Sequence, residues 1–310
     1  MESTPRFFKK LALLAKKETG YGDDAVPTGL LNAMQMANVT VTRLNSPVSR
    51  DLLLPYLGRQ GLILTNRHVR IEGEIEIAGS GEAGVAPAFG PMLEASGMVA
   101  VEVPDTSWTY SPVSAGFPAV TLYYNRDGVR QVALGSRGNV TWEFVPAAIP
   151  RFKFNLLGLE GLVTDSPLPT VDLDGFITPV PVSKANTTFS LHGAPRIAER
   201  VSFDMGQKVE PRFLIGEESI KITDRDATGS AVIQAGLLAD KDWYAIAKAR
   251  TRGPLQLVHG TVPGNIVTFA APAVELDEPT EGQTQNILNY TIGLGFIPVA
   301  GNDELTLAFT

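Results

Sequence analysis

Residues 120–134 read VTLYYNRDGVRQVAL, and this stretch decides the fold class. Two runs rich in β-branched and aromatic side chains, 120–124 and 129–134, flank an Asp127-Gly128 pair. Such a pair favours a tight turn between two strands, because both of its residues tolerate the positive φ angles that the turn requires. The stretch therefore predicts an antiparallel β-hairpin.

Further segments on both sides of this hairpin also predict strands. Residues 39–42 are β-branched throughout, which favours a pleated strand. Residues 71–77 read IEGEIEI, so Glu and Ile alternate on opposite faces and only Gly73 interrupts the pattern. Residues 139–145 and 151–157 supply two more strands.

Two short helices are expected between the strands. The first covers residues 89–96, with Pro91 in its first turn, where proline is tolerated. The second covers residues 240–250, where Trp243 and Ile246 fall on one helical face.

An internal repeat links the two halves of the chain. Residues 62–67, LILTNR, match residues 220–225, IKITDR, at a separation of 158 residues. Gly58 and Gly216 precede the two segments at the same separation. Further matches follow in the same order: IEIAG at 75–79 with VIQAG at 232–236, and GNVT at 138–141 with GNIV at 264–267. The smaller separation of the last pair implies about thirty extra residues in the first copy.

These patterns predict a mainly β protein with two tandem copies of one β domain, each with one short helix beside it. The expected boundaries are an N-terminal arm at 1–36, a first domain at 37–165 with a long inserted loop at about 80–118, a Pro-rich linker at 166–182, and a second domain at 183–310. The basic start of the arm is compatible with a helix.

Composition excludes several classes of function. The net charge is −7 and the sequence pI about 5.1, which argues against a surface that clamps nucleic acid. The chain has no Cys, so disulfides, thiolate metal sites and Cys nucleophiles are excluded. The apolar run at 11–15 is too short for a signal peptide and no stretch is long enough to span a membrane. We therefore expect a protein made in the cytoplasm, with no membrane partner.

Motifs that could carry chemistry are weak. Residues 79–84 read GSGEAG and match G-x-G-x-x-G, but Pro87 and Pro91 prevent a helix from starting at the last Gly. The three His (His68, His192 and His259) have no metal-ligand spacing, and the acidic pairs Asp172/Asp174 and Asp224/Asp226 lack the rest of a calcium loop. We predict no catalytic residues, no metal and no cofactor.

Two charge patterns remain as candidate sites. Glu72, Glu74 and Glu76 share one strand face, which is explained either by cross-strand partners at Arg151 and Lys153 or by an acidic face that lines a wet channel. The chain also begins basic and ends acidic. Candidate contacts between subunits from this pattern are Lys9, Lys10, Lys16 and Lys17 with Glu275, Asp277, Glu278 and Glu281.

Residues 13–29, LLAKKETGYGDDAVPTG, resemble the opening of siphophage major tail proteins, which form tail tubes. Residues 196–216, with VSFDMG at 201–206, also resemble strands of that family. The resemblance implies β-sandwich or barrel-like tube domains whose sheets join between subunits around an electronegative lumen. Family tubes have six domains in a ring, so two domains per chain imply homotrimer rings with pseudo-sixfold symmetry.

The resemblance further implies a structural, non-enzymatic subunit of the virion tail, assembled in the host cytoplasm into stacked rings that conduct DNA at ejection. Its partners would be further copies of itself, a tape measure protein and adaptor proteins at the tail ends, with DNA present only in passage. The alternatives are a virion-associated or secreted β-sandwich that binds glycans, which needs an exposed aromatic platform, and a two-domain β hydrolase, for which no catalytic constellation is found.

Overall fold

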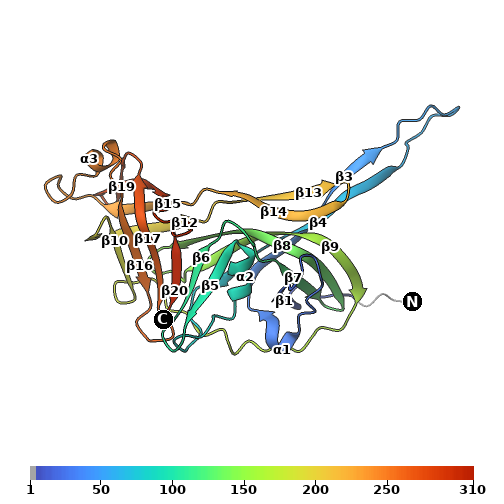
Figure 1. Cartoon of the computed structure of the whole chain (residues 1–310), viewed down its shortest axis with the longest axis horizontal. Helices are drawn as coiled ribbons and strands as arrows, with labels where there is room; N and C mark the ends of the chain where they lie inside the picture. Colours follow the sequence, from blue (N-terminus) through green and yellow to red (C-terminus); the bar gives the residue numbers. More distant parts are fainter. Residues whose placement is uncertain (1–4) are drawn as a thin grey trace.

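The computed structural model describes residues 5–310 and confirms a mainly β chain, with open sheets rather than a closed barrel (Figure 1). The helices of this described part are short: α1 (Gly29–Asn32), α2 (Gly90–Ala95) and α3 (Trp243–Lys248). The strands before residue 166 are β1 (Leu11–Lys17), β2 (Ala33–Met34), β3 (Ala37–Ser49), β4 (Leu62–Glu76), β5 (Met98–Val103), β6 (Ser107–Pro112), β7 (Val120–Arg126), β8 (Val129–Phe144) and β9 (Arg151–Asp165).

The strands of the second half follow a connector of residues 166–186. They are β10 (Thr187–Leu191), β11 (Ala194–Pro195), β12 (Ala198–Asp204), β13 (Gln207–Leu214), β14 (Glu217–Arg225), β15 (Thr228–Gln234), β16 (Gly253–His259), β17 (Val267–Leu276), β18 (Thr280–Thr284), β19 (Ile287–Phe296) and β20 (Thr306–Phe309).

The predicted hairpin is confirmed as β7 and β8. Arg126 and Val129 face each other, so the turn consists of Asp127 and Gly128, whose φ angles are 37° and 95°. Strand β8 continues to Phe144 and includes the strand expected at 139–145. The helices expected at 89–96 and 240–250 are α2 and α3.

The helix-compatible interpretation of the basic N-terminal segment is wrong, because residues 11–17 form strand β1. This strand pairs along its whole length with β7 and also with β2. Its residues from Ala12 to Ala15 are all buried, which requires cover on both faces. A continuous apolar run can meet that requirement as a strand, so tertiary packing overrides helix propensity here.

The two halves of the chain have the same order of strand pairing. The first half pairs as β1–β7–β8–β9–β4–β3, and the second as β10–β16–β17–β19–β15–β12. Helix α2 precedes β7 in the chain, as α3 precedes β16. We call these sets the first repeat and the second repeat. Ile75 and Ile233, 158 residues apart, are both buried, so this separation holds through the strand and the separation of 157 inferred from the sequence is one residue short there. The predicted match of 138–141 with 264–267 is wrong, because Gly138 lies opposite Leu156 in the second half of β8, whereas Val267 begins β17 opposite His259.

Four long strands of the first repeat are each replaced by two shorter ones in the second, and the first of them is β3, whose place is taken by β12 and β13. Strands β14 and β15 together take the place of β4, and β17 with β18 that of β8. Strands β19 and β20 take the place of β9. Such breaks keep the pairing order and change only the local course of the chain.

The stretch expected as a long inserted loop contains α2 and a β5–β6 hairpin. Strand β6 pairs with β20 in register Tyr110 to Leu307, so the extra residues of the first repeat bind an edge strand of the second. The Pro-rich connector has no strands between residues 166 and 186 and is anchored along the first repeat, where the Asp172 N–H donates to the Gly29 carbonyl at 3.0 Å.

One strand pairing joins the two repeats edge to edge. Residues Thr141 to Phe144 of β8 pair with Val201 to Asp204 of β12. At this joint the rings of Trp142 and Phe203 stack with centroids 5.4 Å apart, and Trp142 is only 1% exposed. The buried side chains of both repeats consequently form one continuous core.

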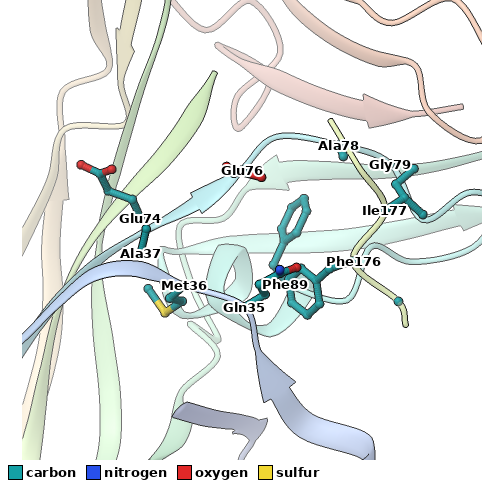
Figure 2. Close-up of a pocket in the computed structure, with 11 residues that line it drawn as sticks. Gln35, Met36, Ala37, Glu74, Glu76, Ala78, Gly79, Phe89, Phe176 and Ile177 are labelled. Atoms are coloured by element: carbon teal, nitrogen blue, oxygen red, sulfur yellow. The ribbon is translucent and has the colours of Figure 1, made fainter. Parts of the chain in front are cut away.

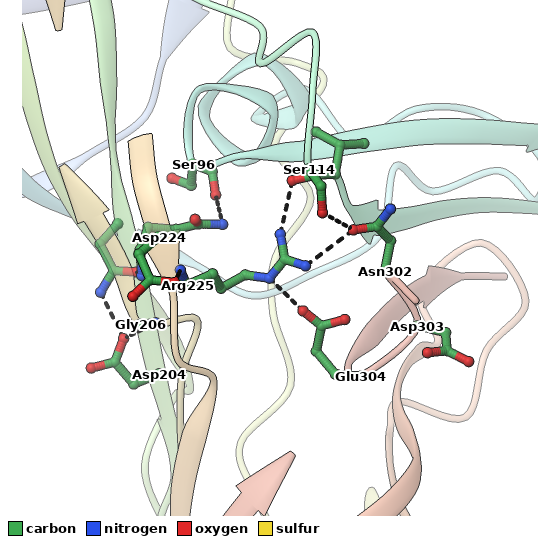
Figure 3. A network of polar contacts seen from close by, with 12 residues as sticks. Ser96, Ser114, Asp204, Gly206, Asp224, Arg225, Asn302, Asp303 and Glu304 are labelled. Carbon is green, nitrogen blue, oxygen red and sulfur yellow. Dashed lines mark hydrogen bonds and ion pairs between the residues drawn. The ribbon is translucent and has the colours of Figure 1, made fainter. Parts of the chain in front are cut away.

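A second joint is polar and centres on Arg225 at the end of β14 (Figure 3). Its guanidinium binds the Glu304 carboxylate, donates to the Val113 carbonyl at 2.8 Å and donates to Asn302 Oδ1 at 3.2 Å. Both side chains of the ion pair are largely buried, with 13% and 6% of their surface exposed. Arg225 therefore links the β13–β14 hairpin, the end of the β5–β6 hairpin and the loop before β20.

Replacing Glu304 by Gln should lower the free energy of unfolding by about 3 kcal/mol, because the Arg225 charge would remain buried without its counter-charge. Urea denaturation followed by tryptophan fluorescence measures this loss. The matched control is Asp224→Asn, which breaks the exposed pair with Lys208 at 2.6 Å and should leave the midpoint unchanged. Equal losses in both variants would contradict a special role for the buried pair.

Candidate functional site

One face of the joined sheet is polar across both repeats. Strands β4, β9, β8, β12, β15 and β19 lie side by side in this order. Because side chains alternate along each strand, Phe152 and Ile75 enter the core while Arg151 and Glu76 occupy the opposite face. The polar face is therefore one continuous surface built by both halves of the chain.

Glu72, Glu74 and Glu76, which we call the Glu row, lie on this polar face. Arg151 neutralises part of their negative charge. The Arg151 guanidinium contacts Glu74 at 3.3 Å and Glu76 at 3.0 Å. The hydrogen bond to Glu76, followed by that to Glu74, raises the pKa of Arg151. Glu72 accepts a hydrogen bond from Thr40 at 3.3 Å and makes no ion pair within residues 5–310. The cross-strand explanation of the row thus holds for Arg151.

Lys153, the other expected partner, points to a different carboxylate. It contacts Glu143 at 2.8 Å, and Arg200 of β12 contacts the same carboxylate at 2.8 Å. The hydrogen bond from Lys153 lowers the pKa of Glu143, and the charge of Arg200 adds to this effect. Glu143 therefore ties three strands together on the polar face, across the joint between the repeats.

A hollow of about 200 Å³ lies beside Glu74 and Glu76 (Figure 2). Met36, Phe89 and Phe176 line it together with backbone of neighbouring segments. Both carboxylates are bound by Arg151, so the hollow presents no free charge to a ligand. Within the described residues no group of three or more His, Asp or Glu could hold a metal ion.

Several residues of the predicted end-to-end charge pattern have partners inside the chain. Lys17 contacts Glu94 at 2.9 Å, and Lys10 lies 3.7 Å from Asp127. Glu275 contacts Arg250 at 2.6 Å and Arg252 at 3.6 Å, and Glu281 accepts a hydrogen bond from Tyr244. In the part of the chain that the structure describes, the candidates without an ion pair are Lys9, Lys16, Asp277, Glu278 and Glu281.

The β3–β4 hairpin carries many exposed apolar side chains, which were not among the features predicted from the sequence. Its outer part, residues 43–67, projects from the body, whereas the β13–β14 hairpin lies along β8 and β9 (Figure 1). We call residues 43–67 the arm; this segment is distinct from the N-terminal arm expected at 1–36. Exposed apolar side chains on the arm are Val48, Leu52, Leu53, Leu54, Tyr56, Leu57, Leu62, Ile63 and Leu64. The density of Leu and Ile in residues 52–64 was a usable signal, because consecutive exposed apolar residues indicate an interaction surface.

Several strand edges are also open in the described chain, since β5, β13 and β14 each have one partner strand, and two further open edges matter here. Strand β3 pairs only with β4, and β18 pairs only with β19. Their other edges present unpaired backbone N–H and C=O groups, which are ready to pair with another chain. Sequence patterns could not find these edges, because an edge depends on which strands are neighbours and not on residue type.

The glycines of the G-x-G-x-x-G match allow close packing between the repeats. The Gly79 N–H donates to Asn265 Oδ1 at 2.9 Å, and the Gly81 N–H donates to the Gly264 carbonyl at 2.9 Å. A Cβ atom on Gly79 would lie 2.0 Å from the Gly264 oxygen. Residues 79–84 thus form a turn that packs against the second repeat.

The remaining sequence motifs are accounted for locally. His192 Nε2 lies 3.0 Å from the Val274 carbonyl and His259 Nε2 lies 3.1 Å from that of Val180, so both bind backbone. Asp172 accepts from the Asp174 N–H at 2.9 Å, as in a turn. Trp142 and Trp243 are buried and Trp108 is half-buried, so the tryptophans form no exposed glycan platform. None of the described helices has the length and hydropathy of a membrane-spanning segment.

Comparison with known families gives a match over most of the chain. The family described as phage tail tube protein matches residues 9–299, which includes nearly all of both repeats. A search among curated proteins finds no match.

Substituting Gly79 by Ala should destabilise the chain by about 2 kcal/mol, because the new methyl group overlaps the backbone of Gly264. Gly61→Ala is the matched control: a methyl group at that position would have nothing within 4 Å, so stability should not fall. Thermal unfolding of both variants gives the comparison. Identical melting temperatures would mean that the repeats do not approach as closely as described.

Proposed function

The chain belongs to the phage tail tube protein family, and from this premise we propose that it polymerises into stacked rings that form the conduit for DNA ejection. Membership makes it a structural subunit of a phage tail tube and a component of the virion tail. The family is structural rather than enzymatic. Ring formation, stoichiometry and the passage of DNA are parts of the proposal.

The shared pairing order of the two repeats is the observation that carries this proposal. We propose that residues 37–165 and 183–310 are two tail-tube domains, with β1 completing the first. Three chains would then supply six equivalent domains and close a homotrimer ring with pseudo-sixfold symmetry. Edge-to-edge joining of sheets, already present between β8 and β12, supports this arrangement because the same type of contact can continue around a ring.

The polar face of the joined sheet is our candidate for the lumen wall. Glu72, Glu74 and Glu76 would contribute negative charge, and repulsion would let DNA slide without binding. In the second repeat the equivalent positions are Ser230, Val232 and Gln234, at the same separation of 158 residues. Negative charge would therefore alternate between domains around the ring. The tape measure protein would occupy this lumen before ejection.

Contacts between stacked rings are proposed for charges that remain without ion pairs. Lys9, which precedes β1, and Lys16, near the other end of this strand, would meet Asp277 and Glu278 of the next ring. Complementary charges of this kind steer association more than they add affinity. Adaptor proteins at the tail ends would cap the outermost rings, and assembly would take place in the host cytoplasm.

Electron microscopy of the purified protein should show rings or tubes with threefold symmetry and six similar lobes, because each chain carries two equivalent repeats. A reconstruction should place Glu72, Glu74 and Glu76 on the inner wall. Rings of six chains with true sixfold symmetry would contradict the tandem arrangement. The Glu row on the outer wall would end the lumen assignment, and a persistent monomer that binds sugars would favour the glycan-binding alternative.

Reversing two charges, with Lys9→Glu and Lys16→Glu, should slow tube growth about tenfold at low ionic strength, because steering between rings would become repulsive. Light scattering during assembly measures the rate. Adding Asp277→Lys and Glu278→Lys to the same chain should restore growth by exchanging the charges. A rate that the second pair of substitutions fails to restore would show that these side chains do not meet.

A further inference from the structure

We infer that neighbouring chains in the ring meet through a copy of the contact that joins the two repeats inside each chain. The inference rests on the proposed tube function and adds the partner, the strands and their register. The partner is a second copy of this chain. The contact has two parts, a pairing of strand edges and a docked hairpin.

The strand pairing inside the chain sets the template. On the polar face of the joint, Ser202 of β12 lies opposite Glu143 of β8, and Asp204 lies opposite Thr141. Strand β12 has an open counterpart in the first repeat, β3, and this part of β8 has an open counterpart in the second repeat, β18. Each chain therefore holds one occupied joint and the two unoccupied halves of another.

The equivalence of β3 with β12 fixes one side of the register. Thr40 lies opposite Glu72 in β4, and Ser202 lies opposite Ser230 in β15. Glu72 and Ser230 are equivalent positions of the repeat, so Thr40 corresponds to Ser202. Two residues further on, Thr42 corresponds to Asp204 in the same way.

The equivalence of β18 with β8 fixes the other side. Lys153 in β9 lies opposite Thr141, and its counterpart in β19, Thr291, lies opposite Thr280. Thr280 therefore corresponds to Thr141, and Gly282 to Glu143. Between chains the copied joint places Thr42 opposite Thr280 and Thr40 opposite Gly282, in antiparallel pairing.

The hairpins give an independent observation in favour of the same contact. Ile220 and Ile222 of β14 are 0% and 7% exposed, because the β13–β14 hairpin lies on the first repeat. Their counterparts in the arm, 158 residues earlier, are Leu62 and Leu64, which are 47% and 53% exposed. Apolar side chains at equivalent positions are thus covered in one repeat and uncovered in the other. The second repeat of a neighbouring chain is the surface that would cover them.

The covering surface of the first repeat shows what the neighbour must supply. Tyr21 bonds through its hydroxyl with the Ile220 N–H at 2.5 Å, and Arg137 donates to the Ile220 carbonyl at 2.9 Å. Glu275 occupies the position in the second repeat that Arg137 occupies in the first. Its carboxylate forms ion pairs with the guanidinium groups of Arg250 and Arg252. Guanidinium donors are therefore present at the equivalent place in the second repeat.

This contact is head-to-tail, since one chain offers β3 with the arm and the next offers β18 with its surroundings. A head-to-tail contact generates a closed ring if its rotation closes and a filament if it does not. The step between chains would repeat the step between repeats. Ring size would therefore be built into the fold of the single chain.

Disulfide trapping tests the register, because the chain has no native Cys. Oxidised Thr42→Cys/Thr280→Cys protein should form covalent dimers and trimers, and no larger species, since directly opposed strand residues lie within disulfide reach. Thr40→Cys/Thr280→Cys is diagonal in this register and should give at least tenfold less cross-linked product. Ser202→Cys/Glu143→Cys is the intrachain control and should close a disulfide without a change in mass on a denaturing gel.

The outcomes separate this inference from the proposed function. Rings in electron micrographs together with preferential cross-linking of the diagonal pair, or of neither pair, would overturn the inference and leave the tube function standing. Failure to form rings or tubes under any assembly condition would overturn both. Cross-linked species larger than trimers would contradict a copied step that closes at three chains.

Substitution on the arm tests the hairpin. Leu62→Asp should raise the critical concentration for assembly at least tenfold and leave the melting temperature of the free chain unchanged, because Leu62 is exposed there. Leu162→Asp changes an equally apolar residue on β9 that is 76% exposed and lies outside the copied contact, so assembly should be unaffected. Normal assembly of the Leu62 variant would show that the arm docks elsewhere.

Discussion

The backbone edge of a β-strand must find a partner, and this constraint organises the whole molecule. Unpaired N–H and C=O groups at an edge attract any other extended chain. Inside this chain the edge of β8 is satisfied by β12, and the edge of β20 by β6. These two pairings join the repeats into one sheet system with one core. Among the edges that remain open, those of β3 and β18 are where assembly would begin.

Strand pattern and repeat order were predictable from the sequence because they depend on short-range regularities. The Asp127-Gly128 turn and the alternation at 71–77 are local, and the structure follows both. The N-terminal strand was missed since a short apolar run has no periodicity that separates strand from helix. The broken strands of the second repeat were likewise invisible, because pairing across a break is set by neighbouring strands.

The candidate site was predictable only in part, for a related physical reason. Residue types identified the Glu row, and the structure adds that Arg151 binds two of its members. The charged termini looked like one pattern, but Lys17 and Glu275 have partners close by in the fold. Edges and exposed hairpin faces are properties of topology. The structure shows them, because equivalent strand edges and side chains are covered in one repeat and uncovered in the other.

The copied joint would differ from its template in one respect that suits a reversible assembly. Trp142 and Phe144, which face the core in the intrachain joint, correspond to Glu281 and Gln283 in β18. Burial of large aromatic side chains stabilises the intrachain joint permanently, whereas a carboxylate and an amide keep the open edge soluble. Backbone pairing would then supply register between chains, and Leu62 and Leu64 of the arm would supply apolar burial. A chain built this way folds alone, and the joint between its own repeats has the geometry of the contact with a neighbouring chain.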